Sequence, residues 1–175
     1  MSCVIAVLVA CSGGARSSDV AALRRRPLVL PSLTAGQPCP ADSVVSQPTP
    51  GLGQMLGNAP VRPVFGTGAT MAFAPAKNYG SAIWGGNKVI WAVAPDVRTD
   101  VLIRGHQLDG DSDIRFNYGD AELLPDLVLD VSRTASSISG GWRDFPTATR
   151  VQRPGCYAIQ IDSADRSDVL VFLVI

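Results

Sequence analysis

The sequence holds little of what catalytic and nucleic-acid-binding sites are commonly built from. It contains one histidine, His106, and no Gly-x-Ser-x-Gly segment, so no base and nucleophile stand out as a hydrolytic pair. Only 17% of the residues are charged, and 15 basic residues balance 15 acidic ones. A chain without a basic surplus does not match a nucleic-acid-binding protein. One histidine without a Cys-x-x-Cys pair also leaves too few ligands for zinc, and we expect no cofactor.

The N-terminal apolar run is too short to cross a membrane as a helix, and it ends directly before Cys11. The residues Leu8-Val9-Ala10-Cys11 resemble the lipobox of bacterial lipoprotein signal peptides. The resemblance implies that residues 1–10 are a signal peptide that is removed and that Cys11 then carries the lipid. The small polar residues 12–18 suit a tether. No Lys or Arg precedes Cys11, unlike in an ordinary secretory signal, and the alternative is a short buried strand.

Cysteine is also scarce, with four in the whole chain. Removal of Cys3 with the signal peptide and lipidation of Cys11 would leave Cys39 and Cys156. An even pair of cysteines in an exported protein indicates a disulfide, and two buried free thiols are the alternative.

Helical periodicity is nearly missing, with a trace of it only at residues 20–23. Residues 11–58 combine frequent prolines with small polar residues, a composition that breaks helices and central strands alike. We therefore expect a lipidated Cys11 followed by a disordered N-terminal tether, and a folded domain over residues 59–175.

Short β-branched and aromatic runs, separated by turn-forming residues, predict the strands of that domain. They cover residues 60–65, 70–73, 88–93, 101–105, 114–118, 127–131, 147–152, 156–161 and 169–175. The last two flank a polar turn and predict a hairpin, whose second strand is apolar on both faces and should be covered on both sides. The pattern predicts an all-β, antiparallel sandwich of about seven to nine strands.

The segment Arg153-Pro154-Gly155-Cys156-Tyr157 resembles the entry to the penultimate strand of bacterial immunoglobulin-like domains. The resemblance implies an immunoglobulin-like sandwich with the Tyr157 hydroxyl reaching the backbone at its corner. Cys156 precedes the tyrosine instead of following it, so a disulfide of the antibody kind is not implied. Residues 88–91 and 102–110, with the closing hairpin, are also similar to a group of small exported bacterial proteins without an assigned activity.

Four aromatic residues lie in Gly-rich or Pro-flanked segments, which a sandwich displays at its ends. They are Tyr79, Trp84, Trp142 and Phe145. Exposed rings at such places can stack on a sugar or dock a partner. The alternative is that Trp142 covers the open end of the core while Trp91 fills its centre.

Two further patterns suggest chemistry only weakly. Asp109, Asp111 and Asp113 stand at alternate positions, as oxygen ligands of Ca²⁺ can, but a polar hairpin turn explains them equally well. His106 could act as a base if one of the aspartates 100, 109 or 111 oriented its ring, yet nothing in the sequence fixes that geometry.

We therefore expect a non-catalytic binding or envelope-associated module. The lipid anchor would hold it to a bacterial cell membrane on the extracytoplasmic side, where a protein or a glycan is its partner. The alternatives are a small cell-envelope hydrolase and a calcium-binding β-domain.

Overall fold

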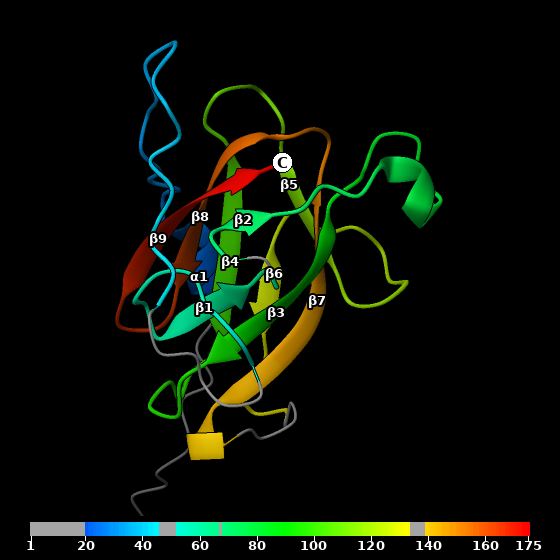
Figure 1. Cartoon of the computed structure of the whole chain (residues 1–175). Helices are drawn as coiled ribbons and strands as arrows, with labels where there is room; N and C mark the ends of the chain where they lie inside the picture. Colours follow the sequence, from blue (N-terminus) through cyan, green and yellow to red (C-terminus); the bar gives the residue numbers. More distant parts are fainter. Residues whose placement is uncertain (1–19, 46–51, 67, 134–138) are drawn as a thin grey trace, which may run out of the picture.

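Two β-sheets pack face to face in the computed structural model (Figure 1), which describes residues 20–45, 52–66, 68–133 and 139–175. One sheet has the strand order β1–β3–β7–β5 and the other β2–β9–β8–β4–β6. The strands are β1 (Val61–Val64), β2 (Thr70–Met71), β3 (Asn87–Val93), β4 (Val101–Gln107), β5 (Ile114–Asn117), β6 (Leu127–Leu129), β7 (Arg143–Val151), β8 (Gly155–Asp162) and β9 (Ser167–Val174). The predicted β class is confirmed, and the strand pairs are antiparallel except β2 with β9.

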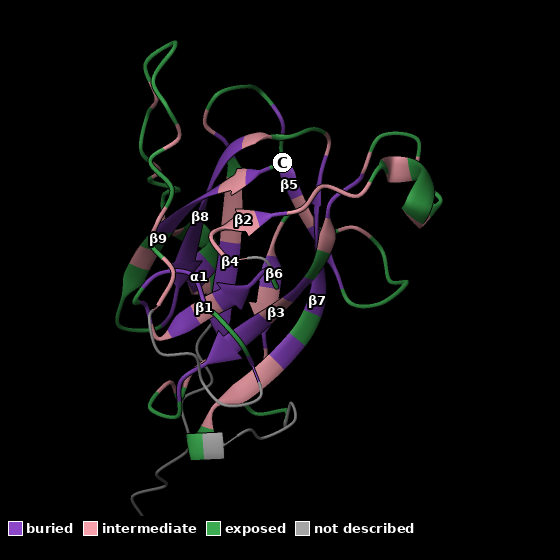
Figure 2. Ribbon diagram, viewed as in Figure 1, coloured by how far each residue is buried: buried purple, intermediate pink, exposed green. Residues whose placement is uncertain are grey.

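Alternation along the strands decides which side chains form the core between the sheets. Tyr157, Ile159 and Ile161 of β8 point inward, as their spacing predicts, and they meet residues such as Trp91 of β3. Buried residues lie along the strands of both sheets (Figure 2). The Tyr157 hydroxyl donates a 2.8 Å hydrogen bond to the carbonyl oxygen of Arg153, so the expected contact with backbone is present.

Residues 20–45, here called the N-terminal segment, differ from the disordered tether that we expected. They begin with helix α1 (Val20–Arg25) and run along the second sheet, close to strands β4, β8 and β9. Leu30 and Leu33 pack on Ala158 and Val171, which face away from the core. The described residues of the expected linker therefore belong to the folded domain, while residues 1–19 and the predicted signal peptide and Cys11 lie outside the described residues.

This segment explains why β9 is apolar on both faces. One face of β9 contributes Leu170, Phe172 and Val174 to the core between the sheets. On the other face, Leu30 and Leu33 cover Val171, whereas Val169 remains 39% exposed. At the edge of β9, the backbone N–H of Val171 donates to Asp42 Oδ2 at 2.7 Å, and the Val171 carbonyl accepts from the backbone N–H of Asp42 at 2.8 Å. The sequence predicted that this strand is covered on both sides but did not show that the cover comes from the N-terminal segment.

The predicted disulfide between Cys39 and Cys156 is confirmed, with a Cα–Cα distance of 5.4 Å. It joins the N-terminal segment to the start of β8 across 117 residues of sequence. Cys156 is buried, and the cystine lies in the same apolar cluster as Leu30 and Leu33. The disulfide therefore fixes the segment where its apolar contacts hold it.

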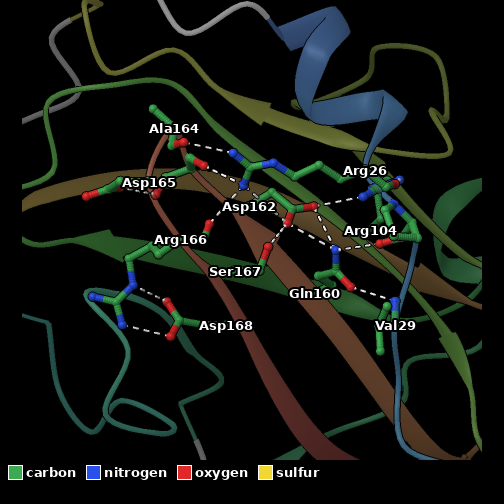
Figure 3. Close-up of polar contacts among 12 residues, drawn as sticks. Arg26, Val29, Arg104, Gln160, Asp162, Ala164, Asp165, Arg166, Ser167 and Asp168 are labelled. Carbon is green, nitrogen blue, oxygen red and sulfur yellow. Dashed lines mark hydrogen bonds and ion pairs between the residues drawn. The ribbon is translucent and has the colours of Figure 1, made fainter.

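A buried carboxylate makes a second connection between the N-terminal segment and the sheet (Figure 3). The Asp162 side chain is fully buried and accepts a 2.8 Å bond from Arg104 Nη2. It also accepts hydrogen bonds from Gln160 and Ser167, and Arg26 Nη1 lies 3.8 Å away. The same Arg26 donates to the carbonyl of Ser163 at 2.7 Å. Asp162 thus links α1 and its following loop to strands β4, β8 and β9.

Within the described part of the chain, no helix is both long and apolar enough to span a bilayer.

Candidate functional site

The outer face of the first sheet presents two arginines side by side. Arg115 of β5 pairs directly with Arg150 of β7. Their neighbours Phe116 and Val151 point into the core, so both arginines lie on the opposite face. Like charges directly opposite each other destabilise an antiparallel strand pair unless other groups compensate them. Other groups must therefore compensate these two positive charges.

Two of the predicted aromatics provide part of that compensation. Arg150 Cζ lies 3.3 Å from the ring centre of Tyr79, and Arg115 Cζ lies 5.6 Å from that of Trp84. A guanidinium over an aromatic face gains about 0.5–2 kcal/mol, and more as water is excluded. Arg115 is also paired with Asp113, at 2.8 Å. The prediction that Tyr79 and Trp84 face a ligand is untested, but the structure brings both rings to one place.

The loop carrying these aromatics is held against the sheet by its backbone. It begins with the 3-10 helix η1 (Ala76–Tyr79), and the Tyr79 hydroxyl donates to the Gly86 carbonyl at 3.0 Å. Gly86 and Ala74 exchange two hydrogen bonds, and the Gly85 N–H donates to Val151 at 2.9 Å. These backbone hydrogen bonds at Ala74, Gly85 and Gly86 therefore help to fix the positions of the Tyr79 and Trp84 rings.

Gly86 should be the most sensitive position of this loop. Its φ is +105°, and a Cβ there would lie 3.0 Å from Arg150 Cα and closer still to the carbonyl oxygen of Thr149. We expect Gly86→Ala to lower the free energy of unfolding by about 2–3 kcal/mol, because backbone cannot move aside as a flexible side chain can. Urea denaturation measures this effect.

Gly80→Ala is the matched control, since Gly80 also has a positive φ but nothing lies within 4 Å of its added Cβ. It should cost about 1 kcal/mol, for backbone strain alone. Equal losses in the two variants would contradict the close approach of Gly86 to β7.

A hollow of about 380 Å³ opens between this loop and the one that follows β5. In Figure 1, η1 and the yellow-green loop after β5 lie on the same side of the molecule. The side chains that line it include Tyr79, Ser81, Trp84, Asn117, Asp120 and Arg150. A second hollow of about 420 Å³ shares Tyr79, Asp120 and Arg150 and adds Lys88. We call these two adjoining hollows the arginine cleft; each has the volume of a small-molecule site.

Arg150 is the most unusual side chain of the arginine cleft. It is only 8% exposed, and its Nε donates to Asn117 Oδ1 at 3.3 Å. Its Nη1 is buried and has no hydrogen-bond partner among the described residues. Burial lowers the pKa of Arg150, yet a guanidinium keeps its charge in proteins. A buried cation with an unused donor attracts an acceptor, preferably an anionic one.

The other two predicted aromatics lie elsewhere. Phe145 pairs with Trp91 across β3 and β7 and is buried in the core. Trp142 packs on the cluster around Met55 and Val64, with the guanidinium of Arg62 at 5.2 Å from its ring centre. Neither ring lines the arginine cleft.

The three aspartates considered for calcium each have a different partner. Both oxygens of Asp109 accept from the backbone N–H of Cys156 at 3.0 Å. Asp111 pairs with Arg153 at 3.1 Å, and Asp113 pairs with Arg115. In the ranges that the structure describes, no three His, Cys, Asp or Glu side chains are grouped closely enough to hold a metal ion.

We accordingly expect millimolar Ca²⁺ to leave the melting temperature unchanged. A specific ion would bind the native state and raise the melting temperature by mass action, but these carboxylates already serve backbone or arginine groups. Differential scanning calorimetry with CaCl₂, and with MgCl₂ at the same ionic strength, makes the comparison. A rise of several degrees with Ca²⁺ alone would restore the calcium hypothesis.

His106 is exposed on β4, where it pairs with Ala158 and forms an isolated bridge with Asp113. Two of the aspartates proposed to orient it accept hydrogen bonds from the backbone: Asp100 from the Val131 N–H at 3.2 Å, and Asp109 from the Cys156 N–H at 3.0 Å. His106 does not line the arginine cleft.

The sequence did not single out Arg115, Asn117 or Arg150. Alternation in 114–118 did indicate that Arg115 and Asn117 share an outward face. That Arg150 joins them follows from the register of β5 against β7, which pairs residues far apart in the sequence. The available signal was the charged Arg150 within the run Thr147-Ala148-Thr149-Arg150-Val151, whose other members are uncharged.

Comparison with protein-family models, curated protein sequences and solved structures gives no significant match to this chain.

Proposed function

We propose that this chain is a non-catalytic binding module that uses the arginine cleft, held to the outside of a bacterial cell membrane by a lipid on Cys11. One observation carries the binding role: the buried guanidinium of Arg150, which makes no ion pair with a carboxylate of the described residues, borders two hollows of small-molecule size. Buried cations are usually paired with an anion, as Arg104 is with Asp162, so an unpaired one at the edge of a hollow suggests that the anion comes from a ligand.

The anchoring part rests on the lipobox-like residues 8–11 and on the disulfide. Disulfides persist in oxidising compartments outside the cytoplasm, so the Cys39–Cys156 bond supports export. Diacylated or triacylated cysteine binds a bilayer tightly, since each buried methylene adds about 0.8 kcal/mol. The folded part would then sit close to the membrane, with at most residues 12–19 between the lipid and α1.

We further propose that the sandwich is of the immunoglobulin-like kind. Its support is the tyrosine at the start of β8, whose hydroxyl bonds to backbone four residues upstream, as in the tyrosine corner of that fold.

The anchor is tested by the mass of the N-terminal peptide from the membrane fraction. We expect a mature chain beginning at an acylated Cys11, and we expect Cys11→Ser to leave the protein unacylated. An unmodified chain that keeps Met1 and fractionates with soluble proteins would refute the anchor.

The binding role is tested by photocrosslinking in cells. A photoreactive residue at Asn78, an exposed position that lines the arginine cleft, should give a discrete crosslinked product. Arg150→Gln should remove most of that product. The same probe at Asp165, which is exposed in the turn between β8 and β9, is the positional control. Identical products from Asn78 and Asp165, unaffected by Arg150→Gln, would refute a binding role for the cleft.

A further inference from the structure

The charge balance of the arginine cleft favours an anion. Arg115 has Asp113 as its ion-pair partner, whereas Arg150 makes no ion pair with a carboxylate in the described residues. Lys88 borders the second hollow and adds a further positive charge. Asp120 is the acidic side chain that lines both hollows, and it is exposed to water. The buried end of the cleft is thus positive and its open end carries one negative charge.

The unused donor of Arg150 suits a carboxylate in particular. A guanidinium is planar and offers paired N–H groups that match a carboxylate or phosphate oxygen pair. Tyr79 lies against the guanidinium and Asn117 accepts from Nε, while Nη1 is buried and meets no acceptor, so no carboxylate of the described residues neutralises this group. A phosphate would bring nearly two negative charges next to Asp120, whereas a carboxylate brings one. The acidic neighbour therefore favours the carboxylate.

The remaining lining suits the body of a sugar. Trp84 is half-buried and borders the hollow, as aromatic platforms for sugar rings do. Asn78, Ser81 and Asp120 line the same hollow and can donate to or accept from hydroxyl groups. A fatty acid would gain nothing from these polar groups, whereas a sugar can hydrogen-bond to them.

We propose that the arginine cleft binds an acidic sugar residue of a glycan, with the carboxylate at Arg150, the ring against Trp84 and hydroxyl groups at Asp120. This assignment rests on the binding role proposed above and adds the ligand class to it. Removal of the carboxylate from the ligand, or of the guanidinium from the protein, should have the same effect on affinity.

The test is calorimetric titration of the full chain, purified in detergent, with defined sugars. The acidic probes are methyl β-D-glucuronide and methyl β-D-galacturonide. Methyl β-D-glucoside and methyl β-D-galactoside match their rings without the carboxylate, and sodium acetate and inorganic phosphate match the anion without the ring. We expect at least one uronide to bind about tenfold more tightly than its neutral partner, than acetate and than phosphate.

Substitutions of single residues test whether Arg150 and Trp84 cause the preference for the uronide. Arg150→Gln should remove the preference for the uronide, and Trp84→Ala should weaken uronide and neutral sugar alike by about tenfold. Arg153→Gln, an exposed arginine paired with Asp111 outside the cleft, should change nothing. Because Arg150 is buried and its variant can unfold, Asp120→Asn provides an independent test at an exposed position. It should weaken the neutral sugar a few fold, because an amide is a weaker acceptor for the sugar hydroxyl groups, and it should raise the preference for the uronide over the neutral sugar severalfold, because a negative charge near the carboxylate is removed.

Three outcomes overturn the assignment. Equal affinity for uronide and neutral sugar removes the role of the carboxylate, and equal affinity for uronide and acetate or phosphate removes the role of the ring. No binding of either uronide also rejects it. In each case, an Arg150-dependent crosslink from Asn78 in cells would still support the binding module, whereas loss of that crosslink as well would reject both proposals.

Discussion

Replacing Cys39 and Cys156 together by serine should lower the free energy of unfolding by about 4–5 kcal/mol. The disulfide closes a loop of 117 residues, so it removes much of the entropy of the unfolded chain. It also holds the N-terminal segment on β8 and β9, where Leu30 and Leu33 are otherwise its main apolar contacts. Urea denaturation of the variant and of the native protein, both without reductant, gives the difference.

Two controls distinguish the effect of losing the disulfide from the effect of replacing the two cysteine side chains. Native protein treated with reductant should lose a similar amount of stability, whereas the double serine variant should not respond to reductant. A loss of less than about 1 kcal/mol would mean that the segment is held without the disulfide, or that the unfolded chain is already compact.

The second large effect is expected at Asp162. Asp162→Ala should cost about 3–5 kcal/mol, because it leaves the guanidinium of Arg104 largely buried without its carboxylate. The Arg104 side chain is only 16% exposed, so water can replace little of the lost interaction. Arg26, Gln160 and Ser167 lose an acceptor at the same time. Urea denaturation measures the stability, and limited proteolysis should show earlier cleavage within residues 20–45.

Asp168→Ala is the matched control for Asp162→Ala. Its carboxylate pairs with Arg166 at 2.8 Å, but both side chains reach solvent. Exposed pairs contribute about 0–1 kcal/mol, so this variant should unfold almost as the native protein does. Similar losses in the two variants would show that burial does not decide the strength of the Asp162 network.

The sequence predicted most of the β-strands, because most carry their own alternation or apolar run, but β7 begins at Arg143, four residues before the predicted range 147–152. Strand β8, with Tyr157, Ile159 and Ile161 on one face, and the apolar β9 are the clearest cases. The disulfide followed from elimination among four cysteines, and its geometry is present. The strand predictions depend on the local residue pattern, and the disulfide prediction depends on the number of cysteines. Neither prediction requires the pairing of the strands.

The N-terminal segment shows why the rest could not be predicted. It contacts the sheet through scattered residues, such as Leu30, Cys39 and Asp42, with no helical or strand period between them. Frequent prolines without a period are also typical of a disordered linker, so composition cannot distinguish the two states. The apolar second face of β9 was the only indirect sign that something must cover it.

The arginine cleft could not be predicted from the sequence either, because it is formed by the register of one strand against another. Tyr79 and Trp84 could be selected as aromatics in a glycine-rich loop, but Arg150 becomes their neighbour only through the pairing of β7 with β5. Trp142 and Phe145 had the same local signals and lie elsewhere. Exposure of an aromatic ring is decided by packing, which the flanking glycines and prolines do not reveal.

The two outer faces of the sandwich therefore differ in what occupies them. The N-terminal segment covers part of the sheet that contains β8 and β9 and is held there by a disulfide and by Asp162. The other sheet carries the arginine cleft on its outer face. Under the proposed anchoring at Cys11, the segment that leads to the lipid and the proposed binding site would lie on different sheets.

The central claim is that binding occurs at the arginine cleft, and side-chain NMR tests it most directly. The signals to follow are the Nε–H of Arg150 and the indole N–H of Trp84, with the indole of Trp142 as an internal reference. On addition of the polysaccharide fraction from the envelope of the producing cells, we expect the Arg150 and Trp84 signals to shift together in a saturable way while Trp142 stays unchanged. Shifts at Trp142 or along the N-terminal segment, with Arg150 and Trp84 unmoved, would contradict the account.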